Sequence, residues 1–253
     1  MRPSELRKLF RLEDTYWWFV ARRELVRELL LKYRARLPAS PRILDIGCGG
    51  GAALAVFSEL GRAIGLDRAE EALRLSRSRG DFPLICSSAE RLPLADDAVD
   101  VITALDVLEH VRDDAAAVAE MARACKPGGM AIITIPAYRS LWSEHDEALN
   151  HFRRYRAGEV RRLVEQAGLR VLKLSYCITL LLPVIFAFRT AQKLFGPDKS
   201  GRPKTALRPL PALPNRVLIG LLRLESAWLL RIPLPFGVSV VCAAQKPTRR
   251  ASL

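Results

Sequence analysis

The chain has 253 residues, 50% of them hydrophobic, so it can bury a sizeable core as one large domain or two small ones. Its 40 Lys and Arg residues outnumber 27 Asp and Glu for a net charge of +13, and this Arg-rich excess is compatible with phosphate or anionic-lipid contact without identifying a partner. The five cysteines form no CxxC pair, which argues against a zinc site or a disulfide framework and favours a reducing compartment.

Residues 1–41 are predicted to form a helical segment. Apolar residues recur at helical spacing between residues 18 and 36, and Pro38 and Pro41 end that helix. The start of the chain is charged and lacks the apolar run and cleavage site of a secretory signal. We therefore expect a cytoplasmic protein.

Residues 42–178 show short apolar strands alternating with helices. In chain order we expect strands at 42–46, 63–67, 83–86, 99–103 and 130–135, with helices at 52–60, about 69–79 and about 113–125. Parallel strands need crossover connections. The alternation therefore predicts an α/β fold with a doubly wound, mostly parallel sheet covered by helices on both faces.

The pattern changes in the last third of the chain. We expect a helix at 158–167, a strand at 169–176, apolar helices at about 179–195 and 215–231, and a last strand at 238–244. The last two strands could pair as an edge hairpin. We interpret the chain as a single domain, 1–253, with a helical insertion at 179–234 and a final strand within 235–246.

The longest uncharged stretch of the chain runs from the predicted strand at 169–176 into the insertion. Residues 174–188 include Pro183 and fall short of the roughly 20 residues that a spanning helix needs. The insertion's two apolar helices with flanking cations are typical of an interfacial element rather than a span. The linker between them carries Lys193, Lys199, Arg202, Lys204 and Arg208, which could lie against anionic lipid.

A glycine-rich turn, Asp45-Ile-Gly-Cys-Gly-Gly-Gly51, follows the first predicted strand and opens a helix. Glycine lets the backbone turn sharply and approach a ligand closely. The same spacing, with Asp67 twenty residues beyond Gly47, also satisfies the dinucleotide fingerprint. Spacing alone therefore leaves a nicotinamide oxidoreductase open.

Further segments follow in order: Gly65-Leu-Asp67, Ser88-Ala-Glu-Arg-Leu-Pro93, Ala104-Leu-Asp-Val-Leu-Glu-His110 and Cys125-Lys-Pro-Gly-Gly129. Together with the glycine turn they resemble the successive motifs of class I, Rossmann-like S-adenosylmethionine-dependent methyltransferases. The resemblance implies a seven-stranded sheet with an antiparallel last strand and S-adenosylmethionine as cofactor. A nicotinamide enzyme should carry a second mononucleotide-binding half, which the insertion replaces.

The resemblance also implies a cofactor site. Its predicted residues are Asp45, Gly47, Cys48, Gly49, Gly51, Asp67, Arg68, Ser88, Ala89, Glu90, Leu105 and His110. Asp67 would accept hydrogen bonds from both ribose hydroxyls, since a carboxylate has two acceptor oxygens; the plain alternative is a helix N-terminal residue. Ser88 stands where the family commonly has Asp, so an uncharged acceptor would face the adenine.

Asp106, Glu109 and His110 are spaced to share one face if that segment is helical. The cluster resembles a divalent-metal site of ubiquinone-biosynthesis O-methyltransferases. The alternative, which we prefer, is that the segment only lines the cofactor pocket, so we predict no metal.

Two other segments are candidates for functional roles. Two of the three histidines, His145 and His151, follow the fifth strand with Arg154 and Tyr155, so this loop could supply a general base and orient the acceptor. The structural alternative is helix capping and ion pairing. Tyr16-Trp-Trp-Phe19, with Arg22 and Arg23, resembles the amino-terminal helix that covers the cofactor in related enzymes, or is an aromatic anchor on the core.

The acceptor is left open by the sequence. A small soluble metabolite or a lipid-linked substrate is expected, with an anionic membrane surface as a candidate partner and a peripheral location on the inner face of the membrane. A non-catalytic membrane-surface module is a further alternative. No nucleic acid is expected, because the Arg residues are scattered and no reader motif is visible.

Overall fold

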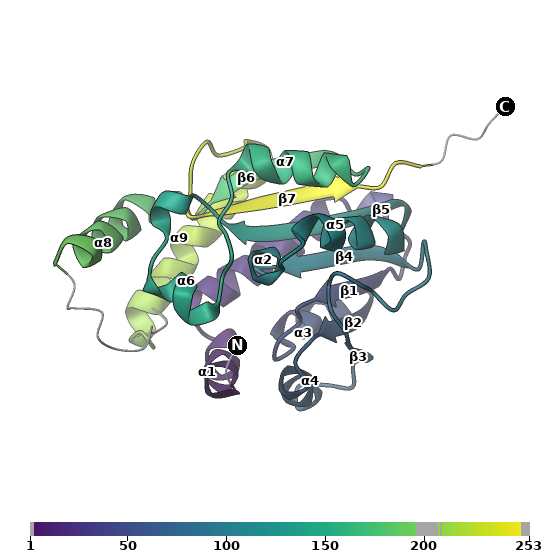
Figure 1. Ribbon diagram of the computed structural model, residues 1–253, viewed down its shortest axis with the longest axis horizontal. Coiled ribbons are helices and arrows are strands. Elements are labelled where there is room, and N and C mark those ends of the chain that lie inside the picture. Colours follow the sequence, from purple (N-terminus) through teal and green to yellow (C-terminus); the bar gives the residue numbers. More distant parts are fainter. Residues whose placement is uncertain (1–2, 196–206, 208, 249–253) are drawn as a thin grey trace.

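Figure 1 shows the computed structural model of the chain, which describes residues 3–195, 207 and 209–248. The strands are β1 Arg42–Ile46, β2 Arg62–Asp67, β3 Leu84–Cys86, β4 Val99–Leu105, β5 Cys125–Pro136, β6 Arg170–Cys177 and β7 Ser239–Gln245. The α-helices are α1 Pro3–Glu13, α2 Trp17–Lys32, α3 Ala52–Ser58, α4 Glu70–Arg77, α5 Asp114–Ala124, α6 Glu144–Leu149, α7 Ala157–Gln166, α8 Leu182–Phe195 and α9 Ala212–Arg231. Short 3₁₀ helices are η1 Arg34–Arg36, η2 Leu108–His110 and η3 Arg139–Leu141.

The strands form one seven-stranded sheet in the order β3-β2-β1-β4-β5-β7-β6. The pairs from β3 to β5 are parallel, and β7 is antiparallel to both of its neighbours. This confirms the predicted fold class, including the pairing of the last two strands. The order reverses between β1 and β4, and such a switch point is where open α/β sheets bind ligands.

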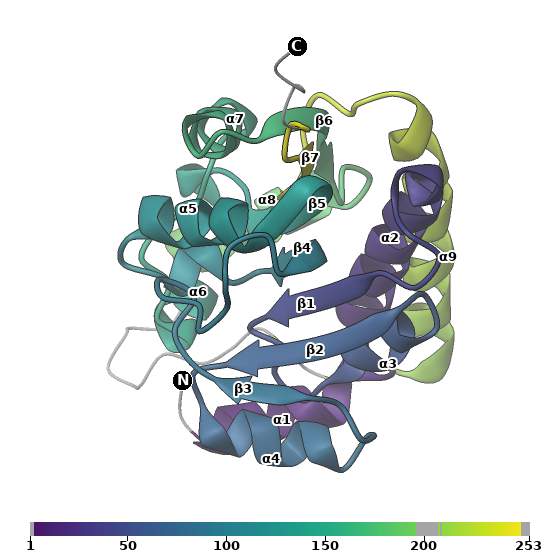
Figure 2. The ribbon, with the colours of Figure 1, turned by 90° about the vertical axis from the view of Figure 1, so that its right-hand side faces the viewer.

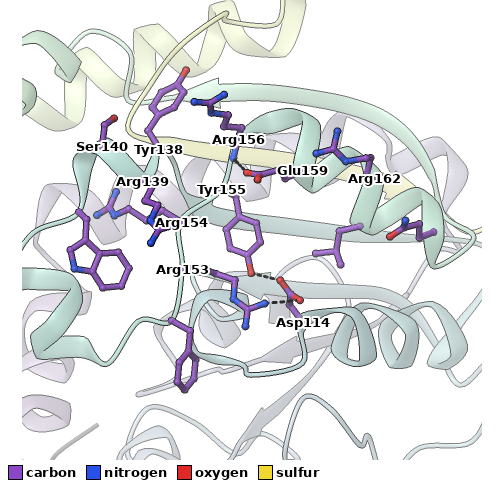
Figure 3. Close-up of a pocket in the computed structure, with 14 residues that line it drawn as sticks. Asp114, Tyr138, Arg139, Ser140, Arg153, Arg154, Tyr155, Arg156, Glu159 and Arg162 are labelled. Atoms are coloured by element: carbon purple, nitrogen blue, oxygen red, sulfur yellow. Dashed lines mark hydrogen bonds and ion pairs between the residues drawn. The ribbon is translucent and has the colours of Figure 1, made fainter.

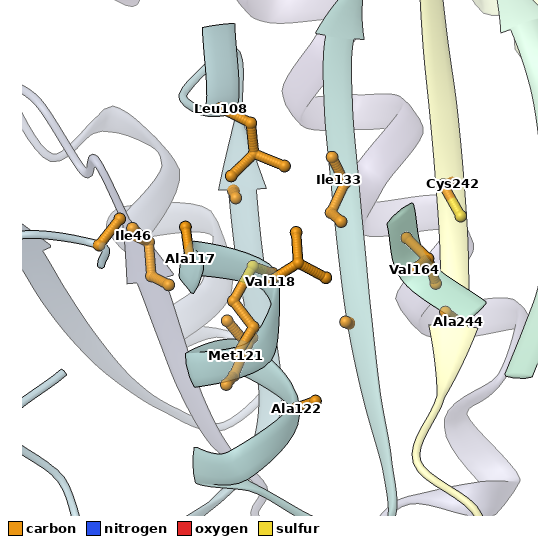
Figure 4. Packing of buried hydrophobic residues seen from close by; sticks show 14 of the residues in the cluster. Ile46, Leu108, Ala117, Val118, Met121, Ala122, Ile133, Val164, Cys242 and Ala244 are labelled. Atoms are coloured by element: carbon orange, nitrogen blue, oxygen red, sulfur yellow. The ribbon is translucent and has the colours of Figure 1, made fainter. Parts of the chain in front are cut away.

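Alternate residues of the central strands face two hydrophobic clusters. Ile102 and Ile133 pack with α5 and α7 on one face (Figure 4), whereas Val101 and Ile132 pack with α2, α3 and α9 on the other. Figure 2 shows these two helical layers on either side of the sheet. Because a strand's side chains alternate between faces, strands buried on both faces are apolar throughout.

The amino-terminal segment and the insertion pack together on one face of the sheet. The Asn215 side chain accepts from Trp17 N at 2.9 Å and donates to Thr15 O at 2.7 Å, which joins α9 to the start of α2. The helix expected up to residue 36 ends at Lys32 and continues as η1. The separate helix α1 was not predicted.

The insertion lies between β6 and β7, but α8 begins at Leu182 rather than near residue 179. The chain turns sharply first, with Ile178 at φ 59°. The buried Glu225 carboxylate of α9 accepts from Ile178 N and, at 2.9 Å, from Leu180 N, and so holds this turn.

Among the described residues, no helix combines the length and the apolar character needed to cross a membrane. Of the predicted linker cations, Lys199, Arg202, Lys204 and Arg208 lie outside the described residues, and the Lys193 side chain is likewise not described.

Candidate functional site

The glycine turn after β1 lies at the switch point of the sheet. Gly47 has φ 67° and Gly51 φ 84°, in the left-handed region. A Cβ atom would lie 2.5 Å from Val107 at Gly47 and 2.3 Å from Ser76 at Gly51. Both positions therefore require glycine. Gly47 N donates to Leu66 O at 2.7 Å, which ties the turn to the end of β2.

Asp45 lies beneath this turn and is only 3% exposed. Its Oδ1 accepts a hydrogen bond from Thr103 Oγ1 at 2.6 Å. Burial raises the pKa of Asp45 to about 7, although the Thr103 hydrogen bond and the nearby Arg22 lower it. The carboxyl group is therefore set to gain or lose a proton near neutral pH.

Asp67 is the last residue of β2. Its Oδ2 accepts from Gly49 N at 3.1 Å, and its Oδ1 accepts from Ala69 N at 2.8 Å. The carboxylate thus bonds to both the glycine turn and the start of α4. It makes the contact expected of a helix N-terminal residue while lying against the predicted cofactor loop.

Ser88 and its neighbours lie beyond β3. Ser88 Oγ donates to Glu90 Oε2 at 3.0 Å, Ala89 is buried, and Arg68 is exposed beside Asp67. None of these residues lines the small cavity at the glycine turn. Their cofactor contacts stay predictions.

That cavity has a volume of about 50 Å³. Five of the predicted cofactor residues line it: Asp45, Gly47, Cys48, Gly49 and Leu105. The opposite wall comes from the amino-terminal segment, through Phe19, Arg22 and Arg23. Ligand pockets usually measure roughly 300–1,000 Å³, so this cavity is smaller than a usual ligand pocket.

Glu13, at the end of α1, completes that wall and was missed by the sequence reasoning. Its Oε1 accepts a hydrogen bond from Gly50 N at 3.2 Å, and its Oε2 forms an ion pair with Arg79 at 3.4 Å. Burial raises the pKa of Glu13. No local pattern marks this residue, because only the folding of α1 across the glycine turn brings it there.

The segment after β4 is not an α-helix, which corrects the expected shared face of Asp106, Glu109 and His110. Asp106 has φ 56°, and only Leu108–His110 forms a 3₁₀ turn. Asp106 is held instead by the Arg22 guanidinium and by Trp18 Nε1 at 3.3 Å. Burial alone would raise the pKa of Asp106, but Arg22 and these hydrogen bonds outweigh it and lower the pKa.

The predicted histidine segment is built around Asp146, which is fully buried in α6. Asp146 Oδ1 lies 2.9 Å from His151 Nδ1, and Arg154 donates to both Asp146 oxygens at 2.7 and 3.1 Å. Burial would raise the pKa of Asp146, but His151 and Arg154 hold it below its usual range. The Arg154 guanidinium is thus engaged inside the protein.

His151 lies between Asp146 and His110 of η2. Its ring lies edge-on to His110, with centroids 4.6 Å apart, and 6.2 Å from the His145 ring. Burial lowers the pKa of both His110 and His145 to about 4, so these two rings are neutral at neutral pH.

Glu109 lies beside these histidines and is 1% exposed. Its Oε2 has no hydrogen-bond partner among the described residues. Candidate ligand atoms of Glu109, His110 and His151 all lie within 4.8 Å of one another. A metal-type cluster therefore exists with His151 in the place that the sequence suggested for Asp106.

Tyr155 is buried, and its hydroxyl donates to Asp114 Oδ2 at 2.7 Å (Figure 3). Burial and the Asp114 carboxylate raise the pKa of Tyr155. Tyr155 also lines a larger cavity, together with neighbouring residues such as Phe152 and Arg156.

The family model described as a methyltransferase domain matches residues 44–133. A probable S-adenosylmethionine-dependent methyltransferase of Mycolicibacterium smegmatis is 33% identical over 165 residues, which cover 63% of this chain and 61% of that protein. A ubiquinone biosynthesis O-methyltransferase of Thiobacillus denitrificans is 38% identical over 100 residues, 36% of this chain and 42% of that protein. The chain thus spans less than two thirds of either relative.

The fold is also found among solved structures. A methyltransferase of Thermotoga maritima, described as a possible histamine N-methyltransferase, superposes with a TM-score of 0.58 over 96% of this chain and 95% of its own, at 18% identity.

Proposed function

The chain belongs to the class I S-adenosylmethionine-dependent methyltransferases, and on that basis we propose that it transfers a methyl group from this cofactor to a small-molecule or lipid-linked acceptor. The observation that carries the proposal is the glycine turn at the sheet's switch point, with Asp45 below it and Asp67 beside it. When bound, the cofactor supplies a sulfonium methyl group, which is already a strong electrophile.

The residues around the turn suit this cofactor. A Cβ at Gly47 or Gly51 would clash with packed atoms, so the backbone is bare where a ligand has to approach closely. Asp67 offers two oxygens to a ribose diol, and Asp45 is a carboxyl group suited to the cationic methionine end. The present cavity of about 50 Å³ is smaller than a usual ligand pocket, and Glu13 lines it, so we propose that this side chain moves away when the cofactor binds.

We assign the general base, needed only when the acceptor must lose a proton, to His151. Asp146 lies 2.9 Å from Nδ1, which leaves Nε2 as the basic nitrogen and makes Asp146 a positioning residue. His145 and Tyr155, the other predicted candidates, fit less well, since burial lowers the pKa of His145 to about 4 and the Tyr155 hydroxyl is bonded to Asp114. The base removes a proton from the substrate that receives the methyl group, as that group is transferred.

The alternative to a base at His151 is that Glu109, His110 and His151 bind a divalent cation. The buried, unpartnered Glu109 Oε2 favours it. Mn²⁺ added to chelator-treated protein would then raise Tm in the wild type, and Glu109→Gln would abolish the shift, whereas the exposed control Glu165→Gln would keep it. Absence of a shift in the wild type supports the metal-free base.

The cofactor assignment is tested by thermal unfolding with S-adenosylhomocysteine and with NADP. A ligand that binds only the folded state raises the free energy of unfolding, by about 2.7 kcal/mol at a hundredfold excess over Kd, and Tm rises as a result. We expect S-adenosylhomocysteine to raise Tm and NADP to leave it unchanged. Asp67→Ala should remove most of the shift, and the exposed Asp81→Ala should not. A shift with NADP alone would favour the oxidoreductase alternative.

We further propose that the protein works in the cytoplasm, peripherally on the inner face of the membrane. The support is an apolar stripe on α9, with Leu213, Val217, Leu224 and Trp228 all exposed. The ubiquinone-enzyme relative matches only 36% of this chain, so the proposal names no particular acceptor.

A further inference from the structure

A second, larger cavity lies apart from the glycine turn. It has a volume of about 1100 Å³, and no residue lines both cavities. Its walls come from the segment after β5, from residues 152–156, from α7 along its length and from Asp114 of α5 (Figure 3). This places it beside the carboxyl end of β5, at the edge of the sheet where open α/β folds bind ligands.

Arginine dominates the charge of this cavity. Five arginines line it, against Asp114 and Glu159. Two of the five are paired: Arg153 with Asp114 at 2.9 Å and Arg154 with the buried Asp146. The Glu159 carboxylate accepts from the backbone N–H of Arg156 at 2.6 Å.

Three guanidinium groups remain without an ion pair to any residue that the structure describes: Arg139, Arg156 and Arg162. Figure 3 shows Arg139 on one side of Tyr155 and Arg162 on the other, with Arg156 beyond the Tyr155 backbone. All three residues are exposed, and guanidinium groups bind phosphate oxygens through two parallel hydrogen bonds, so each offers a charged partner to a phosphate group in this cavity.

The rest of the lining mixes apolar side chains with the polar side chains of Ser140 and Gln166. Trp142, Phe152 and Leu163 contribute to the walls, and the Phe152 side chain is 46% exposed. A ligand that suits this cavity therefore has an apolar portion beside its anionic group.

The backbone at the cavity is strained. Tyr138 has φ 54° although it carries a side chain, and its ring stacks on Tyr176 with centroids 5.0 Å apart. Tyr138 N donates to Tyr155 O at 3.0 Å, which helps to hold this conformation. Strained residues cluster at ligand sites, where the surrounding structure maintains them.

We propose that this cavity is a binding site for a ligand with a phosphate or diphosphate group and an apolar portion. The inference goes beyond the proposed methyl transfer, because the site shares no residue with the glycine-turn cavity and its binding is measured without the cofactor. The phosphate belongs either to a soluble phosphate ester or to a lipid headgroup.

Calorimetry with the full chain, without cofactor, tests the proposal with three probes: pyrophosphate, dioctanoyl phosphatidic acid below its micelle concentration, and phosphate-free dioctanoylglycerol. We expect phosphate probes to bind and dioctanoylglycerol not to bind. Binding of phosphatidic acid at least about tenfold tighter than pyrophosphate shows that an apolar portion adds affinity, as the chains of a lipid provide, whereas comparable affinity shows that the site recognises phosphate alone and contradicts the apolar portion.

Matched double variants locate the site. Replacing Arg156 and Arg162 by Gln should weaken phosphate binding at least about tenfold. The control replaces Arg161, which pairs with Glu165, and Arg170, which donates to Gln245; neither lines the cavity, and the charge removed is the same. Circular dichroism checks that both variants fold. Equal weakening in the two variants, equal binding of dioctanoylglycerol, or no binding of either phosphate probe overturns the proposal.

Discussion

Asp45 has a side chain whose charge is coupled to folding. It is buried under the glycine turn, and its pKa of about 7 lies above the ordinary value of 3.8. Between these two pH values the folded protein holds a proton that the unfolded chain has released. Stability must therefore fall as the pH rises through this interval, since the folded state binds more protons there.

We predict that Asp45→Asn removes this part of the pH dependence. Urea unfolding at about pH 5 and about pH 8 should show the wild type losing more stability than the variant, by up to a few kcal/mol, since each pKa unit corresponds to about 1.4 kcal/mol. Other buried carboxyl groups with a raised pKa, such as Glu109 and Glu225, contribute equally to both proteins and cancel in the difference.

The exposed Asp81→Asn is the control for that experiment and should follow the wild type. Parallel curves for the wild type and Asp45→Asn would show that Asp45 is ionised in the folded protein throughout the range. Buried Thr103, which donates to Asp45, would then stabilise the carboxylate more than its burial disfavours it.

At the scale of single elements, α9 has two different faces. Leu222, Glu225 and Leu229 are buried, and Asn215 ties the helix to the start of α2. The opposite face is an apolar stripe. Leu213 is 74% exposed and Trp228 51%. A surface helix normally turns polar residues outward, so a stripe of this kind marks a contact surface.

The charges around the stripe favour an anionic membrane surface. Arg216 and Arg231 are exposed, whereas Glu225, the one acid of this helix, is buried. Each cation near an anionic leaflet adds up to about 1 kcal/mol of binding.

We predict that the protein sediments with phosphatidylglycerol vesicles at low salt, sediments less with phosphatidylcholine, and is released by high salt or carbonate. Leu224→Glu should weaken vesicle binding at least about tenfold, because it replaces a large apolar side chain on the stripe. Ala95→Glu adds the same charge on an exposed loop and should have little effect. Equal or absent sedimentation with both lipids, together with a dimer that Leu224→Glu dissociates, would identify the stripe as an interface between two copies.

The turn after β4 shows the limit of arguments from spacing. Asp106, Glu109 and His110 would share one face only if this segment were helical. Asp106 takes φ 56° instead, with its N–H donating to Thr134 O at 2.9 Å on β5 and its carboxylate held by Arg22 of α2. Both partners come from distant parts of the chain, so no local pattern could predict this turn.

At the scale of the whole molecule, the reversal of strand order brings the site together. β1 pairs with β2 on one side and β4 on the other, so the ends of all three strands meet at the glycine turn. The amino-terminal segment then crosses this edge, and Glu13 reaches Gly50 over a separation of 37 residues. Residues of α1 and α2 therefore line the cavity at the glycine turn.

The sequence by itself determined the doubly wound sheet, its antiparallel last strand, the helical insertion and the family. The alternation of strands and helices follows from local periodicity, whereas the antiparallel last strand and the family come from the resemblance of motifs such as Asp45–Gly51 to those of class I methyltransferases. Only the tertiary structure decided the neighbours of each polar side chain. Asp146 binds His151 and Arg154 within one short segment whose fold the spacing did not predict. Glu109 lies beside His151, and Arg139 lines the same cavity as Arg162 of α7, because separate elements pack against one another. Burial, charge pairing and cavity shape depend on such long-range contacts, which one-dimensional spacing does not encode.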